Sequence, residues 1–184
     1  ETVNQLNEWM DPRHIMTSAF DDPTQDERER PPLWRFWTAL PGKGRIGIFF
    51  GAWHSDSIVD RVFGKLTDAE LDQHISSSRR FEKMLSDEGA LILKFWFHLT
   101  KKQQKRRLED LASSPDTAWR VSETEWQYFE KHDKFEKVAE HYLRRTSTSE
   151  APWIVVAGAD PSYRALTVGR TVLAALRERL DEKP

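Results

Sequence analysis

The residues best placed for chemistry follow a short apolar run that ends at Phe50. The run Arg45–Phe50 (RIGIFF) comes after a turn and leads into a helix-like segment, which predicts a buried strand, a turn and a helix. In α/β proteins, ligands bind beyond the carboxyl ends of such strands. Residues Phe50 to His54 occupy that place, and they offer no carboxylate, no Lys or Arg and one imidazole. His54 could act as an acid or base, although no neighbour in the sequence orients it, and a packed or solvated histidine is the favoured alternative.

A second set of candidates is a run of basic residues on a predicted helix that begins at Thr100 and extends through Leu111. These side chains could grip a polyanion, or they could form an ordinary solvated helix face. Glu109 and Asp110 follow closely and weaken the positive field. Both interpretations stay open for this cluster, which consists of Lys101, Lys102, Lys105, Arg106 and Arg107.

Other residues with chemical potential have simpler explanations. The segment Pro41–Gly44 lacks the leading glycine of a phosphate-binding loop and precedes a strand instead of following one, so it predicts a turn. Lys94 interrupts an apolar run, where it could reach the sheet edge, pair with a carboxylate or serve a function. The remaining histidines show no metal-ligand spacing; they are His14, His74, His98, His132 and His141.

The composition excludes several classes of protein. A chain of 184 residues is long enough for one domain with a core. It has no apolar run long enough for a membrane span, no secretory signal and no cysteine. The net charge of −2 gives no reason to expect nucleic-acid binding. We therefore expect a cytoplasmic protein. Most of the eight tryptophans are expected in the core, namely Trp34, Trp37, Trp53, Trp96, Trp126 and Trp153, whereas Trp119 stays open as a stacking platform.

The elements that must position these residues alternate between strands and helices. Helices are predicted from the start of the chain to Asp11, from Pro31 to Leu40, before Gly64, and behind capping boxes at Thr67–Glu70, Thr100–Gln103 and Ser122–Glu125. Strands are predicted at 14–20, 90–99 and 153–156. The strand at 90–99 should be buried on both faces. Residues 21–29 are predicted to form a loop. This order predicts a parallel sheet with helices on both faces.

Several stretches together resemble the polyphosphate kinase 2 family, and most closely the N-terminal half of the two-domain members that transfer phosphate from polyphosphate to AMP. The resemblance covers essentially the whole chain in the same order. The stretches that carry it are ETVNQLNEWMDPR, PTQDERERPP, LWRFWTALP, GRIGIFFGAWHSDSIVDRV, RRFEKMLSDEGALILKFWFHLTKKQQKRRL and TSTSEAPWIVVAGAD.

The resemblance implies one domain over residues 1–184, with a P-loop kinase-like parallel sheet of five strands and a helical lid at about 100–146. Such enzymes use Mg²⁺ to move a phosphoryl group between inorganic polyphosphate and a nucleotide. Their glycine-rich Walker A loop would come directly before Glu1, so this loop and the first strand are expected to be absent from this sequence.

The resemblance also implies a defect at the strand end described above. Active members read Asp-Arg-Ser-Trp-Tyr there, with the aspartate helping to hold magnesium, whereas this chain reads Phe50-Gly51-Ala52-Trp53-His54. A phenylalanine supplies no oxygen to Mg²⁺. The phosphate-binding candidates are Arg13, Arg35, Arg61, Lys101, Lys105 and Arg106. For Arg35 and Arg61, a salt bridge to a loop carboxylate such as Asp60 or Glu27 is an equal alternative.

Three hypotheses about function follow. The first is a degenerate half of a polyphosphate:AMP phosphotransferase, which supports a sister kinase domain or an oligomer and still binds polyphosphate. The second is an active kinase whose magnesium ligands have moved, with Asp56 and Asp60 nearest in sequence. The third is a pure interaction module. The nucleotide, the direction of transfer and the oligomeric state are not predicted.

Overall fold

A computed structural model describes residues 2–181 of the chain. It divides the chain into two units, residues 1–57 and residues 58–184, and each is described by itself below. The predicted start of the first helix at Glu1 lies outside the described residues. Within residues 2–181, no helix combines the length and the apolar character that crossing a membrane requires.

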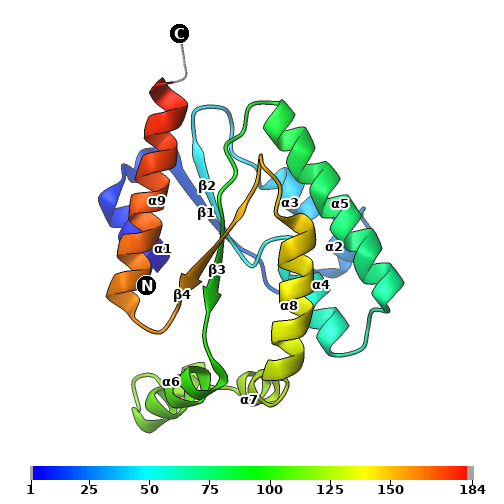
Figure 1. Cartoon of the computed structure of the whole chain (residues 1–184), viewed down its shortest axis with the longest axis vertical. Coiled ribbons are helices and arrows are strands. Elements are labelled where there is room, and N and C mark those ends of the chain that lie inside the picture. Colours follow the sequence, from blue (N-terminus) through cyan, green and yellow to red (C-terminus); the bar gives the residue numbers. More distant parts are fainter. Residues whose placement is uncertain (1, 182–184) are drawn as a thin grey trace. The chain divides into compact units, whose positions relative to one another are not determined.

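The first unit contains a parallel pair of strands. The helix α1 (Thr2–Trp9) and a 3₁₀ turn, η1 (Pro12–His14), lead into β1 (Ile15–Ala19), which pairs in parallel with β2 (Ile46–Phe50) (Figure 1). Between the strands lie the short helices α2 (Gln25–Arg28) and α3 (Trp34–Thr38). The turn predicted at Pro41–Gly44 is present, with Gly44 at a φ of 80°.

The prediction of a loop at 21–29 was wrong. Thr24 accepts from the backbone of Glu27, and Glu27 accepts in return from the backbone of Thr24. This reciprocal pair is a capping box, and it begins α2. The sequence carried the signal, but no apolar periodicity follows it.

The helix α4 (Ser55–Val62) begins in the first unit and ends in the second, where Gly64, at a φ of 78°, follows it. The second unit has its own parallel pair, β3 (Lys94–His98) and β4 (Trp153–Ala157). The long helix α5 (Asp68–Asp87) starts at the predicted capping box of Thr67 and Glu70. The chain closes with α9 (Pro161–Asp181).

Helices lie on both faces of the β3–β4 pair. The helices α5 and α8 (His132–Thr146) supply a core against which Trp96 and Trp153 pack. Because side chains alternate between faces, Phe97 and Val156 point the other way. On that face, Arg164 of α9 lies over the ring of Phe97. The buried residues of the core between α5 and α8 are Ile58, Leu71, Ile75, Ala139, Tyr142 and Leu143.

The structure confirms the parallel pairing within each unit. Among the described residues, β1 pairs with β2 in the first unit and β3 pairs with β4 in the second. The strand predicted at 90–99 is shorter because β4 offers it only five partners. It is also not buried on both faces, since Phe97 is 43% exposed and Val155 of β4 is 62% exposed.

The helix predicted behind the Ser122–Glu125 capping box is in fact two. That capping box does not form, because Ser122 donates to the Glu125 side chain at 3.2 Å and its side chain makes no cap bond to the helix backbone. The helix α7 (Glu123–Glu130) ends before Lys131, and α8 begins at His132. Neither proline nor glycine marks this break in the sequence. The break lies beside two contacts made within the second unit, from the His132 ring to the Leu99 carbonyl and from the Lys134 ammonium to the Val62 carbonyl. Together with α6 (Lys101–Ser113) and the 3₁₀ turn η2 (Ala118–Arg120), these helices occupy the range expected for a lid.

Candidate functional sites at the carboxyl ends of the strands

The carboxyl end of β2 carries the phenylalanine and glycine singled out from the sequence. Phe50 is 67% exposed, and its carbonyl accepts from the backbone N–H of Phe20, which follows β1. Gly51 then turns with a φ of 73°. A Cβ atom at this position would lie 2.9 Å from the Phe20 carbonyl oxygen. The backbone at this edge is therefore shaped for glycine, both by its left-handed conformation and by a close carbonyl.

Behind this edge lies an aromatic cluster. The ring of Phe20 lies 4.7 Å from that of Phe36 and 5.4 Å from that of Phe49, and Trp53 lies about 6 Å from Phe36 and Phe49. These tilted and edge-on contacts are the ones aromatic side chains prefer. Trp53 is half-buried in this cluster, whereas Trp37 is 50% exposed and was wrongly expected in the core. His54 is buried, with its ring 5.2 Å from that of Trp53.

Arg35 is buried in the same unit and its charge is partly compensated there. Its guanidinium lies 3.5 Å from the Glu27 carboxylate and donates to the Asp21 carbonyl at 2.7 Å. It also lies over the rings of Phe20 and Phe36, 5.2 and 5.4 Å from their centres. The alternative of a salt bridge to Glu27 is therefore the one that the structure shows. Its Nε and Nη1 atoms are buried without a hydrogen-bond acceptor among the described residues.

Arg13 and Arg61 are also held by carboxylates. Arg13 makes a two-pronged pair with Asp11, with a shortest distance of 2.6 Å, and this pair lowers the pKa of Asp11 below its usual value. Arg61 pairs with Asp68 at 2.6 Å. The suggested partner of Arg61, Asp60, instead pairs with Lys65 at 3.0 Å.

The carboxyl end of β3 is different, because a basic helix begins directly after it. Thr100 accepts from the backbone of Gln103, and the Gln103 side chain accepts from the backbone of Thr100, so the predicted capping box starts α6. Lys101 then donates to Asp133 of α8 at 2.9 Å. This hydrogen bond lowers the pKa of Asp133 below its usual value.

The basic residues of α6 divide into two groups. Lys105 and Arg106 lie 3.7 Å from carboxylates one turn further along, which belong to Glu109 and Asp110 respectively. Such exposed pairs stabilise a helix by only about 0.3–0.5 kcal/mol, so water or another anion exchanges with them easily. Within the part of the chain that the structure describes, neither Lys102 nor Arg107 has a hydrogen-bond or ion-pair partner.

A small hollow of about 200 Å³ opens beside this end of β3. Its aromatic walls come from Trp96, Tyr128 and Phe135. In it the His98 ring lies 4.0 Å from the Glu136 carboxylate. Sequence reasoning did not single out Tyr128 or Glu136, because only the return of α7 and α8 to the end of β3 brings them there. The full lining is Trp96, Phe97, His98, Leu99, Gln104, Tyr128, His132, Phe135 and Glu136.

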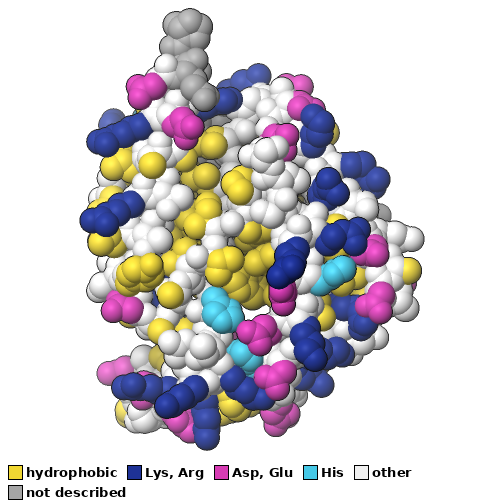
Figure 2. Space-filling model, in the orientation of Figure 1, with side chains coloured by type: hydrophobic (Ala, Val, Ile, Leu, Met, Phe, Trp, Pro, Cys, Tyr) yellow, Lys and Arg dark blue, Asp and Glu magenta, His cyan; other side chains and the backbone are white. Residues whose placement is uncertain are grey.

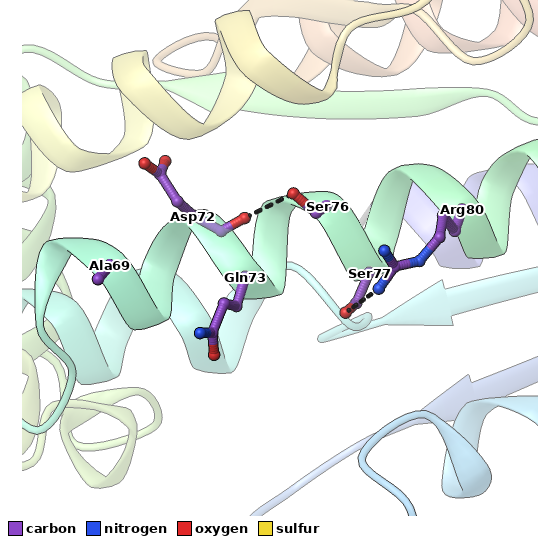
Figure 3. A pocket seen from close by; sticks show the side chains of 6 residues that line it. All are labelled: Ala69, Asp72, Gln73, Ser76, Ser77 and Arg80. Atoms are coloured by element: carbon purple, nitrogen blue, oxygen red, sulfur yellow. Dashed lines mark hydrogen bonds between the residues drawn. The ribbon is translucent and has the colours of Figure 1, made fainter.

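A larger hollow, of about 530 Å³, lies on the outer surface of α5 and is drawn in Figure 3. All the residues that line it belong to this one helix, and they bond among themselves. Ser76 donates to the Asp72 carbonyl at 2.8 Å, and Arg80 donates to the Ser77 hydroxyl at 3.2 Å. The Asp72 carboxylate also pairs with Arg145 and His141 of α8, at 3.4 and 3.5 Å. Since no residue of a second element lines the hollow, it is an open helix surface.

Lys94, the basic residue inside the apolar strand, has a structural partner. Its ammonium donates at 2.7 Å to the Glu82 carboxylate and at 2.7 Å to the Thr146 carbonyl. The charge also lies 5.1 Å from the centre of the Trp153 ring. Burial lowers the pKa of Lys94, and Glu82 opposes that shift. Of the alternatives left open by the sequence, pairing with a carboxylate is the correct one.

The end of β2 offers no suitable magnesium site. Magnesium takes oxygen ligands in a near-octahedral arrangement, commonly from one or two carboxylates and several waters. Phe50 provides no such ligand, and no group of three or more His, Cys, Asp or Glu side chains suited to a metal occurs within residues 2–181. The residues present at the end of β2 do not fit this ion.

Comparison with known proteins decides the family. The model of the family described as "Polyphosphate kinase 2" matches residues 1–184. The chain belongs to the polyphosphate kinase 2 family. Its resemblance to this family, first stated from the sequence, is thereby confirmed.

Two curated family members show the range of similarity. The polyphosphate:AMP phosphotransferase of Pseudomonas aeruginosa is 54% identical over 183 residues, which is 100% of this chain and 37% of that protein. The AMP/ADP-polyphosphate phosphotransferase of Meiothermus ruber is 30% identical over 95% of this chain and 66% of its own length. The chain thus spans a little over a third of the first relative.

Solved structures of the family confirm the fold class. A polyphosphate kinase 2 of Arthrobacter aurescens superposes with a TM-score of 0.92 at 29% identity, covering 96% of this chain and 62% of that one. A crystal structure from Pseudomonas aeruginosa, titled as a putative polyphosphate kinase 2, gives a TM-score of 0.84 at 50% identity, with 99% of this chain and 35% of that one covered.

Proposed function

We propose that the chain is a domain of a phosphotransferase that moves phosphoryl groups between inorganic polyphosphate and a nucleoside phosphate, and that this domain does not catalyse the transfer. The names of its relatives support the reaction and favour AMP as the nucleotide. The observation that carries the loss of catalysis is the end of β2, where Phe50 and Gly51 stand in place of an aspartate and an arginine.

The backbone around Gly51 supports this proposal beyond the change of side chains. Any residue with a Cβ atom meets the Phe20 carbonyl at 2.9 Å in a left-handed conformation. An arginine at this position would have to move the connection between β1 and α2 or reshape its own turn. The edge has therefore adapted to its present residues, as expected of a strand end that no longer positions phosphate.

Polyphosphate binding could persist on α6 without a metal. Lys102 and Arg107 are exposed cations, while Lys101, Lys105 and Arg106 have exposed carboxylate partners that a phosphate can replace. Guanidinium and ammonium groups both suit phosphate, the first through two parallel hydrogen bonds. Arg13, Arg35 and Arg61 are weaker candidates, since each is held by its own carboxylate.

The wider setting follows from the same proposal. Residues 1–184 would act as one domain with a lid at about 100–146, next to a sister kinase domain that supplies the magnesium-dependent chemistry. The domain would stabilise that partner or a homo-oligomer. A cytoplasmic location is part of this proposal, since the proposed enzyme acts on phosphorylated nucleotides.

An active domain with relocated magnesium ligands is the second candidate. It needs Asp56 or Asp60 as a ligand. The ion pair of Asp60 with Lys65 disfavours it, because a metal at that carboxylate would have to displace the lysine. A pure interaction module, the third candidate, would bind neither polyphosphate nor nucleotide.

The experiment measures binding and turnover on this chain extended upstream to include the expected Walker A loop, because a chain without that loop would show no turnover whatever residues end β2. Long-chain polyphosphate is titrated calorimetrically with and without magnesium, and phosphorylation of AMP is followed in parallel. We expect binding that weakens with added salt and does not require magnesium, and no ADP formation. Turnover that Asp60→Asn abolishes would establish the second candidate, and the absence of all binding would leave the interaction module.

Phe50→Ala is the matched control for this experiment. The side chain is largely exposed, so its removal should not disturb the fold. Under the proposal, this variant binds polyphosphate as tightly as the parent chain. A clear loss of binding would show that the polyphosphate binds at the end of β2 and not on α6.

A further inference from the structure

The helix α9 carries an exposed seam of leucines and arginines that the proposed function does not use. Leu166, Leu173 and Leu180 recur every seven residues and are 48%, 49% and 67% exposed. Arg170 and Arg177 lie between them, four residues after one leucine and three before the next. Tyr163, 55% exposed, begins the seam. This spacing of three and four residues places all six side chains along one stripe of the helix.

The stripe is distinct from the side of α9 that packs on its own sheet. Ala165 and Val168, each offset from the seam by one or two residues, are buried. Figure 2 shows hydrophobic and basic side chains side by side along α9. Three large leucines repeated at this exposure on one helix are unusual for a surface that only meets water.

The arginines of the seam are available for a partner. Among residues 2–181, neither Arg170 nor Arg177 has a hydrogen-bond or ion-pair partner, whereas Arg179, one position outside the seam, donates to the Gly89 carbonyl at 2.8 Å. Most of the residues that flank the seam have small side chains, namely Ser162, Thr167, Gly169 and Ala174. Leu176 is a larger flanking residue. Small flanking residues allow another helix to approach closely.

The positive charge of the seam favours an acidic helix over a second copy of α9 as its binding partner. Two copies of α9, packed in either direction, would bring four arginines into one seam, and among the flanking positions only Asp181 at the end of the helix carries a carboxylate. Glu178, which follows Arg177 in the sequence, lies further round the helix, away from the seam. Burying guanidinium groups without carboxylates is costly. A helix with its own acidic residues opposite Arg170 and Arg177 would pair both charges while its apolar residues covered the leucines.

We infer that the stripe of Tyr163, Leu166, Arg170, Leu173, Arg177 and Leu180 is a docking surface for an acidic, leucine-rich amphipathic helix of a partner protein. This interaction is separate from polyphosphate binding on α6, so either can fail without the other. The recognition has two parts: apolar burial at every seventh residue, and guanidinium–carboxylate pairs between those positions.

The test uses two labelled synthetic peptides of the same length as α9. Both repeat leucine at heptad spacing; one carries glutamates at the positions that face the arginines, and the other carries lysines there. Fluorescence anisotropy with the full chain should show binding of the glutamate peptide at least about tenfold tighter than binding of the lysine peptide, a difference of about 1.4 kcal/mol. Added salt should reduce this preference.

Variants of exposed positions separate the two parts of the recognition. Replacing both Arg170 and Arg177 by glutamate should reverse the preference between the peptides, and Leu173→Asp should abolish binding of either. Replacing Arg79 and Arg80, two exposed arginines of α5, by glutamate is the charge-matched control and should change nothing. Circular dichroism checks that each variant is folded.

Three outcomes would overturn the inference: equal binding of the two peptides, no binding of either, or a reversal of preference in the α5 control. Sedimentation addresses the remaining occupant. A dimer of the chain that Leu173→Asp disperses would assign the face to a second copy of this protein instead.

Discussion

The carboxyl ends of β2 and β3 occupy equivalent places in two parallel strand pairs, and they differ in kind. At the end of β2, an exposed phenylalanine and a glycine with a left-handed backbone are backed by aromatic rings. At the end of β3, a capped helix carries five basic residues, and a histidine and a glutamate face a small hollow. In this α/β chain, one strand end carries polar groups that suit an anion, and the other is apolar.

Under the proposed function, this difference means that a strand end can lose its binding site while the fold is kept. The Phe50 side chain is tolerated because it points to solvent, and Gly51 makes a turn that other residues would strain. Neither change disturbs the pairing of β1 with β2. The end of β3, in contrast, is tied to a helix cap and to an ion pair between α6 and α8.

The largest expected effect concerns the anchor of β3. Lys94→Met removes the partner of the buried Glu82 carboxylate and should lower the free energy of unfolding by about 3–5 kcal/mol. Denaturant titration measures it. The double variant Lys94→Met with Glu82→Leu should recover most of this loss, because no unpaired charge then remains. If the double variant were as unstable as the single one, the loss of stability would come from losing the attraction between Lys94 and Glu82, and not from leaving the Glu82 carboxylate buried without a partner.

A smaller effect is expected at the end of β2. Gly51→Ala should destabilise the chain by roughly 1–3 kcal/mol, since it combines a left-handed backbone with a carbonyl at 2.9 Å. Gly64→Ala, left-handed but with open space around it, should cost about 1–2 kcal/mol. Gly42→Ala, with neither constraint, should be nearly neutral. If Gly51 proved as tolerant as Gly42, the end of β2 would not be specialised for glycine.

The basic helix allows the comparison to be sharpened by binding. Charge reversal of Lys102 and Arg107 should weaken polyphosphate binding more than charge reversal of Lys105 and Arg106. The positive charges of the second pair are already partly neutralised by neighbouring carboxylates. Calorimetric titration at two salt concentrations measures both. Equal losses would mean that the intrahelical carboxylates have no influence on the anion.

The smallest effect is a pH dependence at the end of β3. The hydrogen bond from Lys101 lowers the pKa of Asp133 in the folded chain, so the ionised carboxylate stabilises the fold above its ordinary pKa. This contribution is lost as the pH falls through the lowered value. NMR titration of the carboxyl carbon should give a pKa below 3.8, and Lys101→Met should return it towards 3.8. An unchanged pKa in that variant would assign the shift to another neighbour.

Local signals in the sequence determined much of this molecule. The capping boxes at Thr67 and Thr100 correctly predicted where α5 and α6 begin, because a cap depends on residues only three positions apart. Gly64 was correctly expected to end a helix, since its positive φ angle of 78° is a local property. The apolar runs located all four strands to within a few residues. The sequence stretches that contain these elements also identified the family.

Only the tertiary structure decided which charges are available. Whether Lys94 was a functional group or the partner of Glu82 depended on residues 12 and 52 positions away, namely Glu82 and Thr146. The partner of Arg61 was Asp68 and not the neighbouring Asp60, because rotamers and side-chain reach select the pair, and not proximity in sequence. The break before α8 likewise lies beside contacts to distant carbonyls. Caps, turns and periodicity are short-range and can be read in the chain, whereas the pairing of long charged side chains is settled when helices and strands from distant parts of the sequence meet.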